Sequence, residues 1–434
     1  MTQTKVLNRW WVVLGAILIQ LALGAIYAWS VFTKALTAEP YSFTKTQTQI
    51  IFSVGLASFA FVMVLGGRLQ ARIPPRIVAL LGGLMLGLGY ILARFVGTSF
   101  WGHVLTIGVV GGAGIGLAYV VPIAVGVRWF PDKKGMLTGL AVAGFGFGAF
   151  LWIQLAGNLG QLINLMGVAN VFLLYGVLFA VLVTIGSIWM VNPPEGYLPP
   201  GWDPAIQAKK AAKIGGTREF GSLQMLRTPQ FYMLWFMFVA GAMAGLMVIG
   251  VIKLFGIERL QAFYSVAGES DPLRKAEVTA ELAMAIFFAI ANGLGRIGWG
   301  VISDFIGRKA SLVLMLISQT VVMAAFFWLA QTPGLFFLGA CWIGFNFGGN
   351  FALFPAATAD LFGNKNVGAN YGWVFTSYGV GGIVGPILGG YFGDVAKASG
   401  QLQAWLVPFL VAAGACFVAT LLAIALQPPR EEKS

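Results

Sequence analysis

Long apolar stretches recur along the whole chain, and this feature restricts the fold more than any other. The first runs from about Trp10 to Phe32 without a charged residue, and the others begin near residues 46, 76, 101, 134, 168, 229, 277, 308, 333, 367 and 401. The first stretch is longer than the apolar core of a secretory signal and can cross a bilayer. Each span should be helical, because lipid offers the backbone no hydrogen bonds and a helix satisfies its own amides. The sequence therefore predicts an all-α membrane protein with twelve transmembrane helices.

The composition supports this fold class and excludes several kinds of site. Of 434 residues, 58% are hydrophobic and 10% are charged, whereas soluble domains carry about 25% charged residues. The net charge of +12 comes from basic residues scattered over short loops, a pattern that indicates topology and lipid headgroups and not nucleic-acid binding. Cys341 and Cys416 lie in apolar spans, and His103 is the single histidine. We therefore expect no disulfide, metal site or cofactor.

The distribution of lysine and arginine predicts the orientation. With an even number of spans, most of the 27 basic residues fall in segments on the side of the two termini. Basic residues accumulate on the cytoplasmic side of membrane proteins. We therefore expect a multi-pass protein of the cell (inner) membrane, with both termini cytoplasmic, that acts as a monomer.

The chain divides once. After residue 191 comes a segment rich in proline and glycine and then a polar, basic stretch, with six apolar spans on either side. This pattern predicts an N-terminal six-helix half at 1–191, a cytoplasmic linker at 192–228 and a C-terminal six-helix half at 229–434. A second polar segment, at about 256–276, is expected on the outer face.

The two halves repeat one pattern of glycine and proline. Four pairs share a constant offset of 233 residues: Gly67 and Gly300, Pro122 and Pro355, Gly135 and Gly368, and Gly148 and Gly381. Two six-span halves related in this way are typical of secondary transporters, whose substrate site lies between the halves at the bilayer midplane. The repeat predicts a pseudo-symmetric transporter and not an enzyme.

Several motifs carry a resemblance to a known family. The segment Gly300–Lys309 (GVISDFIGRK) resembles the loop motif of the major facilitator superfamily, although the first-half copy has Ala71 and Pro74 where the motif has Asp and Gly. The segments Arg128–Gly135 (RWFPDKKG) and Asn350–Pro355 (NFALFP) are similar to the oxalate–formate antiporter family, which belongs with the bacterial relatives of the monocarboxylate transporters. The resemblance covers nearly the whole chain and implies the major facilitator fold.

Arg296 is the charge that the sequence places deep inside a span, with no acidic residue within one helical turn. Such a charge is costly unless it is paired or faces a water-filled cavity, and a guanidinium binds a carboxylate through two parallel hydrogen bonds. We predict that Arg296 binds a substrate carboxylate, as the resemblance also implies. The alternative is a structural arginine that bonds carbonyl groups or extends toward the cytoplasmic end.

Asn292 precedes Arg296 by one helical turn, so both side chains can face one cavity. The resemblance implies that eukaryotic monocarboxylate transporters have an aspartate at the position of Asn292, where it pairs with the arginine and is implicated in proton coupling. This chain has a neutral amide there. The amide can donate to a carboxylate or hydroxyl, and the alternative is a helix-packing role.

Aromatic side chains are expected to line the rest of the cavity. The candidates are Tyr27, Phe32, Tyr119, Phe145, Phe347, Phe351, Phe375 and Tyr378. The resemblance implies that the oxalate carriers have Tyr or Trp where this chain has several of these phenylalanines, and Lys where it has Tyr378. With Arg296 as the single cation of the cavity, charge balance favours a substrate with one carboxylate. Packing or lipid contact is the alternative for each aromatic residue.

Two further features have conformational or structural interpretations. We expect Asp304 just past a cytoplasmic helix end, followed by Arg308. The resemblance implies that the family motif forms a gate there, so we predict a gating role for both. Glycine-rich strings such as Gly111–Gly116 lie in apolar spans. We interpret them as sites of close helix packing, because a nucleotide-binding loop needs a preceding strand.

The sequence predicts alternating-access transport of a small monocarboxylate such as L-lactate or pyruvate. Protons are the expected coupling ion, because uptake of an acid anion with one proton is electroneutral. Carboxylate exchange of the oxalate–formate type is one alternative. A membrane sensor is another, and the short termini argue against it. Cationic drug efflux is a third, and it would require an acidic residue in the cavity.

Overall fold

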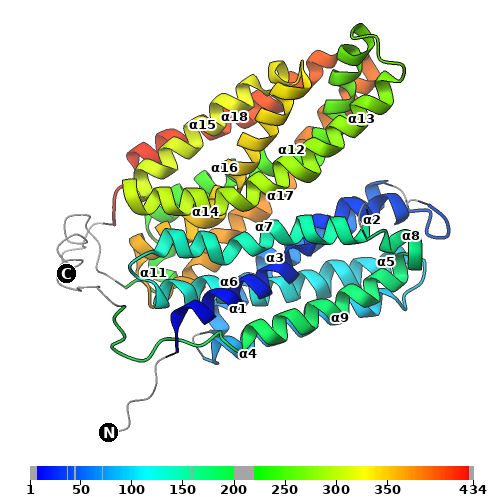
Figure 1. Cartoon of the computed structure of the whole chain (residues 1–434). Helices are drawn as coiled ribbons and strands as arrows, with labels where there is room; N and C mark the ends of the chain where they lie inside the picture. Colours follow the sequence, from blue (N-terminus) through cyan, green and yellow to red (C-terminus); the bar gives the residue numbers. More distant parts are fainter. Residues whose placement is uncertain are drawn as a thin grey trace.

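The computed structural model describes residues 7–36, 38–43, 45–70, 72–157, 160–199 and 219–429. The N-terminal half has six membrane-spanning segments that begin close to the predicted positions (Figure 1). They are formed by α1 (Arg9–Leu23) with η1 (Gly24–Ala28) and α2 (Trp29–Leu36), α3 (Lys45–Leu69), α4 (Pro75–Ala93), α5 (Phe100–His103) with η2 (Val104–Gly111) and α6 (Gly112–Trp129), α7 (Lys134–Ala156), and α9 (Val168–Ser187), which follows the short α8 (Leu162–Met166).

The C-terminal half repeats this arrangement. After the short α11 (Ser222–Leu226), its segments are α12 (Pro229–Val266), α13 (Pro272–Leu282) with η3 (Ala283–Phe288) and α14 (Ala289–Ile306), α15 (Arg308–Leu329), α16 (Pro333–Phe362), α17 (Val367–Ser399), and η4 (Leu402–Trp405) with α18 (Leu406–Ala425). In the described ranges, 11 helices are long and apolar enough to cross a membrane. The twelfth span is α17, which is equally long but richer in glycine and tyrosine.

Proline and short polar caps explain where several helices begin. Pro229 and Pro333 occupy the first turns of α12 and α16, where the missing N–H group costs nothing and the fixed φ suits a helix. Thr228 accepts a hydrogen bond from the backbone of Phe231 at 3.3 Å, which satisfies one donor at the start of α12. The helix boundaries are therefore encoded locally.

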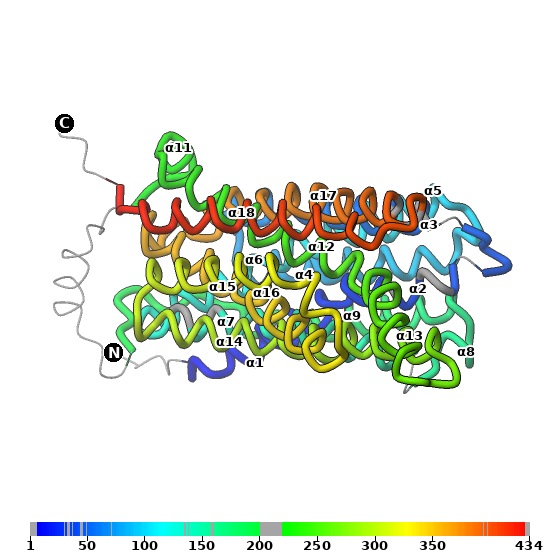
Figure 2. The backbone as a smooth tube through the Cα atoms, turned by 90° about the horizontal axis from the view of Figure 1, so that it is seen from above, coloured from blue at the N-terminus to red at the C-terminus, as the bar shows by residue number. Residues whose placement is uncertain are grey.

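The two halves lie side by side and converge at one end (Figure 1), and the helices of both halves run between the same two ends of the molecule (Figure 2). The start of α1, the end of α18 and α11 share one end, which we call the linker end, whereas α5, α8 and α13 lie at the opposite end, which we call the far end. Figure 1 shows the halves close together at the linker end and spread apart toward the far end. Because the chain ends share one side, the number of spans is even.

Glycines allow the halves to touch. A Cβ atom on Gly67 in α3 would overlap the carbonyl of Gly368 in α17, and one on Gly139 in α7 would overlap the carbonyl of Arg296 in α14. Small residues at such crossings let backbones approach closely, which is how helices pack in lipid. The pairs α3–α17 and α7–α14 therefore form the interface between the halves.

The polar segment predicted at 256–276 is largely helical. It begins within α12, which continues to Val266, and it ends within α13 after a short turn. Tyr264 and Thr279 are joined by a hydroxyl–hydroxyl hydrogen bond of 2.7 Å, and Glu258 accepts one of 2.7 Å from Trp405. The segment is therefore a helical hairpin that packs on the C-terminal half at the far end.

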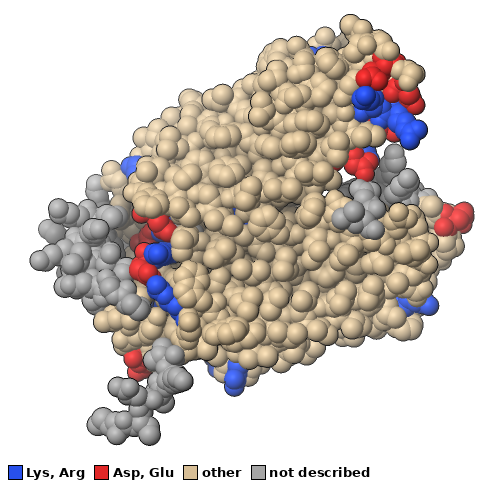
Figure 3. Space-filling model, viewed as in Figure 1, with Lys and Arg blue, Asp and Glu red and all other residues tan. Residues whose placement is uncertain are grey.

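Charged side chains gather toward the two ends of the molecule, and uncharged surface covers its sides (Figure 3). Large apolar residues such as Leu84, Phe236 and Val418 are exposed on the sides. In water such a surface would be a liability, whereas lipid accommodates it. The distribution matches a multi-pass membrane protein.

Candidate functional site

Arg296 lies on α14 at the interface between the halves and is fully buried. Its Nε donates to Oδ1 of Asn292 at 3.2 Å, one turn away on the same helix. Its Nη1 donates to the carbonyl of Val142 in α7 at 2.9 Å and so joins the two halves. Its Nη2 has no hydrogen-bond partner among the described residues. The guanidinium therefore has donor capacity that a ligand can use.

Two phenylalanines hold the guanidinium between them. The guanidinium carbon lies 4.1 Å from the ring centroid of Phe351 in α16 and 5.3 Å from that of Phe145 in α7. A cation over an aromatic face is attracted by the ring quadrupole, and the attraction grows when water is excluded. The two rings therefore stabilise the charge of Arg296 without neutralising it.

Tyr119 on α6 presents a second unused polar group beside Arg296. Its hydroxyl is buried and interacts with the guanidinium of Arg296, although the two do not reach full hydrogen-bond geometry and no other described residue bonds the hydroxyl. The backbone carbonyl of Tyr119 accepts from Nε2 of Gln20 at 3.2 Å, which fixes α6 against α1. Nη2 of Arg296 and the Tyr119 hydroxyl thus form a pair of donors suited to one carboxylate.

Tyr27 and Tyr378 meet across the interface. Their hydroxyl groups are 2.5 Å apart, with Tyr27 on η1 of the N-terminal half and Tyr378 on α17 of the C-terminal half. The Tyr27 ring also contacts Phe145 at a centroid distance of 5.1 Å and Phe347 at 6.3 Å. Phe375 stacks on Tyr378 at 4.9 Å. These contacts close the aromatic cluster around Arg296.

The structure brings together every predicted binding residue except one. The central group consists of Tyr27, Tyr119, Phe145, Asn292, Arg296, Phe347, Phe351, Phe375 and Tyr378. Phe32 instead lies inside the N-terminal half, against Phe172 at 5.0 Å and Tyr175 at 5.9 Å. The prediction that Phe32 lines the cavity therefore receives no support from its contacts.

Two residues that were not predicted from the sequence adjoin the central group. Tyr371 is fully buried, its hydroxyl has no partner among the described residues, and its ring lies 5.7 Å from Phe375. Phe59 on α3 contacts Tyr119 at 5.0 Å and Phe375 at 4.9 Å. Tyr371, Phe375 and Tyr378 follow the i, i+4, i+7 spacing of one helix face, a signal that identifies Tyr371. Phe59 offers no comparable signal.

Asp304 and Arg308 form a charged group at the linker end. Asp304 lies within the last turn of α14, not past the helix end as expected, and pairs with Arg308 at 2.7 Å. Its Oδ2 also accepts from the backbone N–H of Met136 at 2.7 Å, in the first turn of α7. A carboxylate is favoured at a helix N-terminus. Asp304 therefore bridges the halves, and Arg308 is shared with Asp360 at 3.0 Å.

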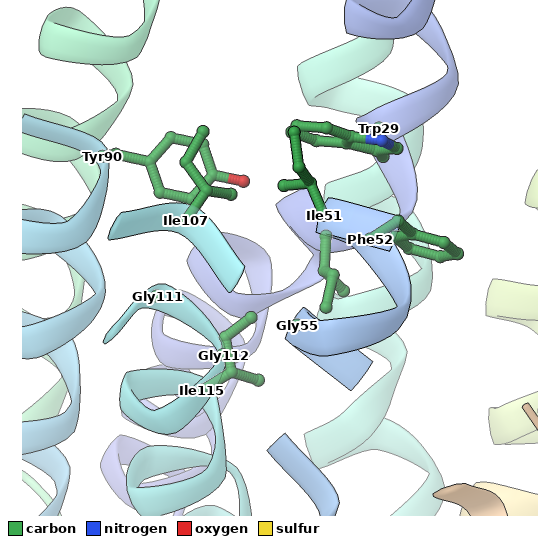
Figure 4. Close-up of a pocket in the computed structure, with 10 residues that line it drawn as sticks. Trp29, Ile51, Phe52, Gly55, Tyr90, Ile107, Gly111, Gly112 and Ile115 are labelled. Atoms are coloured by element: carbon green, nitrogen blue, oxygen red, sulfur yellow. The ribbon is translucent and has the colours of Figure 1, made fainter. Parts of the chain in front are cut away.

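A small pocket lies apart from this group, inside the N-terminal half (Figure 4). Trp29, Tyr90 and Ile107 line it, and its volume is about 10 Å³, enough for about one water molecule. It cannot hold a carboxylic acid. No group of three or more His, Cys, Asp or Glu in the described ranges has a geometry that could hold a metal ion.

Comparison of the sequence with known proteins assigns the chain to a family. The sequence matches the Major Facilitator Superfamily over residues 10–268 and 273–434. The chain belongs to the major facilitator superfamily. It is 27% identical to the oxalate:formate antiporter of Oxalobacter formigenes, over 97% of this chain and 92% of that protein. It is 28% identical to apicoplast pyruvate carrier 1 of Toxoplasma gondii, over 74% of this chain and 65% of that protein.

A solved structure confirms the fold. The proton:xylose symporter XylE bound to 6-bromo-6-deoxy-D-glucose superposes with a TM-score of 0.62 at 15% identity, over 97% of this chain and 96% of that one. This similarity concerns the arrangement of helices alone. The chain is therefore a major facilitator transporter with relatives among carboxylate carriers, and it is not an enzyme. The predicted twelve-helix fold and the predicted family are both confirmed.

Proposed function

We propose that this member of the superfamily transports small monocarboxylates, such as L-lactate or pyruvate, by alternating access with one proton. The observation that carries the proposal is the unused donor capacity at the centre of the interface. Nη2 of Arg296 and the hydroxyl of Tyr119 are both buried and both lack partners in the described ranges. A carboxylate that accepts from both would compensate the charge and fill the unmade hydrogen bonds.

The charge of the site favours one carboxylate per substrate. Arg296 is the one lysine or arginine that is fully buried in the described part of the chain. A dianion would bury one negative charge without compensation, which costs several kcal/mol even after relaxation. Asn292 adds no charge, so the loaded site is neutral with a monoanion. Tyr27 and Tyr378 can then exchange their mutual hydrogen bond for contacts to a 2-hydroxy or 2-keto oxygen.

The comparisons support the substrate class and leave exchange as the second candidate. One relative is named for oxalate and formate and another for pyruvate, and all of these are small carboxylates. The similarity to an antiporter over 97% of this chain favours carboxylate exchange as the alternative. Coupling to protons and exchange differ in one property: only proton coupling lets a pH gradient alone drive accumulation.

The proposal includes an orientation. We assign the linker end to the cytoplasm of a cell (inner) membrane, because the linker and the shared side of the chain ends carry most of the basic residues. The conformation is then closed toward the cytoplasm, with the halves spread toward the outside (Figure 1). In this proposal the protein acts as a monomer, because the site lies between the halves of a single chain.

The test uses Arg296→Ala and Arg296→Lys in proteoliposomes, with labelled L-lactate counterflow as the assay. The Ala variant should lose binding, and the Lys variant should lose most of it, because a point charge cannot replace the planar guanidinium. Arg94→Ala is the matched control, since Arg94 bonds Asn170 away from the central group. Lactate uptake by Arg296→Ala at the control rate, with equal protein in the membrane, would refute the assigned role.

A second measurement separates the two coupling modes. An inward pH gradient, imposed without carboxylate inside the vesicles, should drive lactate above its equilibrium distribution. Collapse of the gradient should leave equilibration alone. Uptake that requires a carboxylate on the opposite side and does not depend on the pH gradient would contradict proton symport and support carboxylate exchange.

A further inference from the structure

Buried polar atoms without partners continue from Arg296 toward the linker end. In the described ranges they belong to Tyr119, Tyr371, Gln70 and Asn364. The hydroxyls of both tyrosines, both amide atoms of Gln70 and Oδ1 of Asn364 make no hydrogen bond. Nε1 of Trp373 on α17 is a further such atom at the interface, where Arg68 lies over its ring, and those of Gln319 lie elsewhere. The four side chains named above follow one another along the interface.

Their order is set by α17 and its neighbours. Phe375 contacts both Tyr119, at 5.3 Å, and Tyr371, at 5.7 Å, so the two tyrosines flank one ring. One turn closer to the linker end, a Cβ on Gly368 would lie 3.3 Å from Nε2 of Gln70. Asn364 precedes α17 in the loop at the linker end. The four side chains therefore lead stepwise from the central site to the linker end.

The series lies between the two halves. Gln70 follows α3 and Tyr119 lies on α6, in the N-terminal half, whereas Tyr371 and Asn364 belong to the C-terminal half. Tyr371 also interacts electrostatically with Tyr119 and Arg296. Helices α3 and α17 are in backbone contact here, because a Cβ on Gly372 would lie 3.0 Å from the Cα of Val64. The series therefore lies where the two halves are in contact.

A polar atom that is buried without a partner destabilises the state that buries it. Native proteins therefore leave few such atoms, and those that exist require an explanation. Here the closed conformation buries several of them in sequence along one interface. When the halves separate at the linker end, the same atoms meet water or the substrate. We therefore expect these polar atoms to have hydrogen-bond partners in the open state and to lack them in the closed one.

We propose that Tyr119, Tyr371, Gln70 and Asn364 form the release route of the carboxylate to the linker end. Tyr371 is the first hydrogen-bond donor that the carboxylate meets after leaving Arg296, and Gln70 and Asn364 receive it at the exit. The proposal rests on the carboxylate transport proposed above. It adds a function for Tyr371, a positioning residue for release, that the binding site alone does not require.

A contact between the halves closes this route. Nη2 of Arg128, from the N-terminal half, donates to the carbonyl of Lys365 at 3.0 Å. The carboxylate of Glu219, in the linker, accepts from the backbone N–H groups of Asn364 at 3.1 Å and Lys365 at 2.8 Å. Glu219 therefore fixes the loop that contains Asn364 and Lys365. The bond from Arg128 to this loop must break before the exit opens.

The first experiment compares Tyr371→Phe with Tyr175→Phe. Both replacements remove one hydroxyl from a buried tyrosine, but the Tyr175 hydroxyl donates to the carbonyl of Trp152 within the N-terminal half. For Tyr371→Phe we expect equilibrium binding of labelled lactate within about threefold of wild type and maximal uptake lowered about tenfold, equivalent to about 1.4 kcal/mol on the opening step. Tyr175→Phe should retain wild-type uptake per folded protein.

The second experiment labels a thiol placed on the route. Tyr371→Cys is made after replacement of Cys341 and Cys416, with Arg76→Cys, exposed in the first turn of α4, as the control. In inside-out vesicles, lactate should accelerate reaction of the thiol at position 371 with a water-soluble methanethiosulfonate reagent severalfold. The control position should show no effect of lactate.

Failure of this proposal is distinguishable from failure of the transport proposal. Wild-type uptake by Tyr371→Phe, or labelling at position 371 from the far end alone, would overturn the release route while lactate binding at Arg296 stays intact. Absence of lactate binding in the wild type would instead overturn the proposed function itself. Slow turnover with retained binding, together with labelling from the linker end, supports the route.

Discussion

Replacing Asn292 with aspartate places a titratable carboxyl group in direct contact with Arg296. Oδ1 of Asn292 accepts from Nε of Arg296 at 3.2 Å, and both side chains are buried. Aspartate has nearly the same shape, so an ionised carboxylate at this position would occupy the same contact. It would neutralise the guanidinium in the empty carrier and compete with the substrate carboxylate.

The expected size of the effect follows from that contact. A hydrogen bond to a charged group is worth about 1.5–3 kcal/mol, so the substrate must displace an interaction of this order. Lactate affinity should fall roughly 10- to 150-fold where the aspartate is ionised. Protonation of the aspartate removes the competition, so the affinity of Asn292→Asp should rise as the pH falls, by at most about tenfold per pH unit. Wild type has no group that titrates at this position and should not show this added slope.

The assay is binding of labelled lactate to the purified protein as a function of pH. Asn292→Ala is the matched control, because it removes the same hydrogen bond without adding a titratable group. The control should show a small loss of affinity and the wild-type pH profile. If the lactate affinity of Asn292→Asp has the same pH dependence as that of wild type, an ionised group at position 292 does not compete with the substrate carboxylate for Arg296. The assignment of Arg296 as the carboxylate-binding residue beside Asn292 is then wrong.

Two further predictions concern specificity and gating. Tyr378→Lys should add a second cation beside Arg296 that compensates a second carboxylate. Oxalate should therefore compete with labelled lactate at least tenfold better than in wild type. Equal binding of oxalate and lactate by wild type would contradict a site with one cation. Asp304→Asn should weaken the contacts to Arg308 and Met136 and increase cysteine labelling from the linker end about fivefold, for a loss of roughly 1 kcal/mol. Asp132→Asn is its control, since Asp132 pairs with Arg9 inside one half, and equal labelling of the two variants would exclude a bridging role.

The spans and Arg296 could be predicted from the sequence because both depend on local chemistry. Helix starts such as Pro229 and Pro333 follow from the conformational restriction of proline. A charged residue in a span is rare and costly, so Arg296 stands out without knowledge of any contact. The pairing of Asn292 with Arg296 follows from helical spacing alone.

Phe32 was predicted to line the cavity because it shares a span with Tyr27, and helical spacing did not support that prediction. Residues Gly24–Ala28 form a 3₁₀ segment, which has 3.0 residues per turn where an α-helix has 3.6. The phase of α2 is therefore shifted relative to α1. Tyr27 faces Tyr378, whereas Phe32 turns toward Phe172 inside the N-terminal half. At α-helical spacing, five residues turn the chain by about 140° beyond one full turn, so the distance from Tyr27 to Phe32 already argues against a shared face.

The partners of Arg296 also bear on the return of the empty carrier. The guanidinium donates to the carbonyl of Val142 and to Asn292 and lies against two aromatic faces. These contacts reduce the cost of a buried charge, and the bond to Val142 joins the two halves. Separation of the halves therefore has to break this bond. Under the net transport proposed above, the unloaded carrier must break it as well, whereas an exchanger breaks it only with substrate bound, so the two coupling modes place different demands on this one contact.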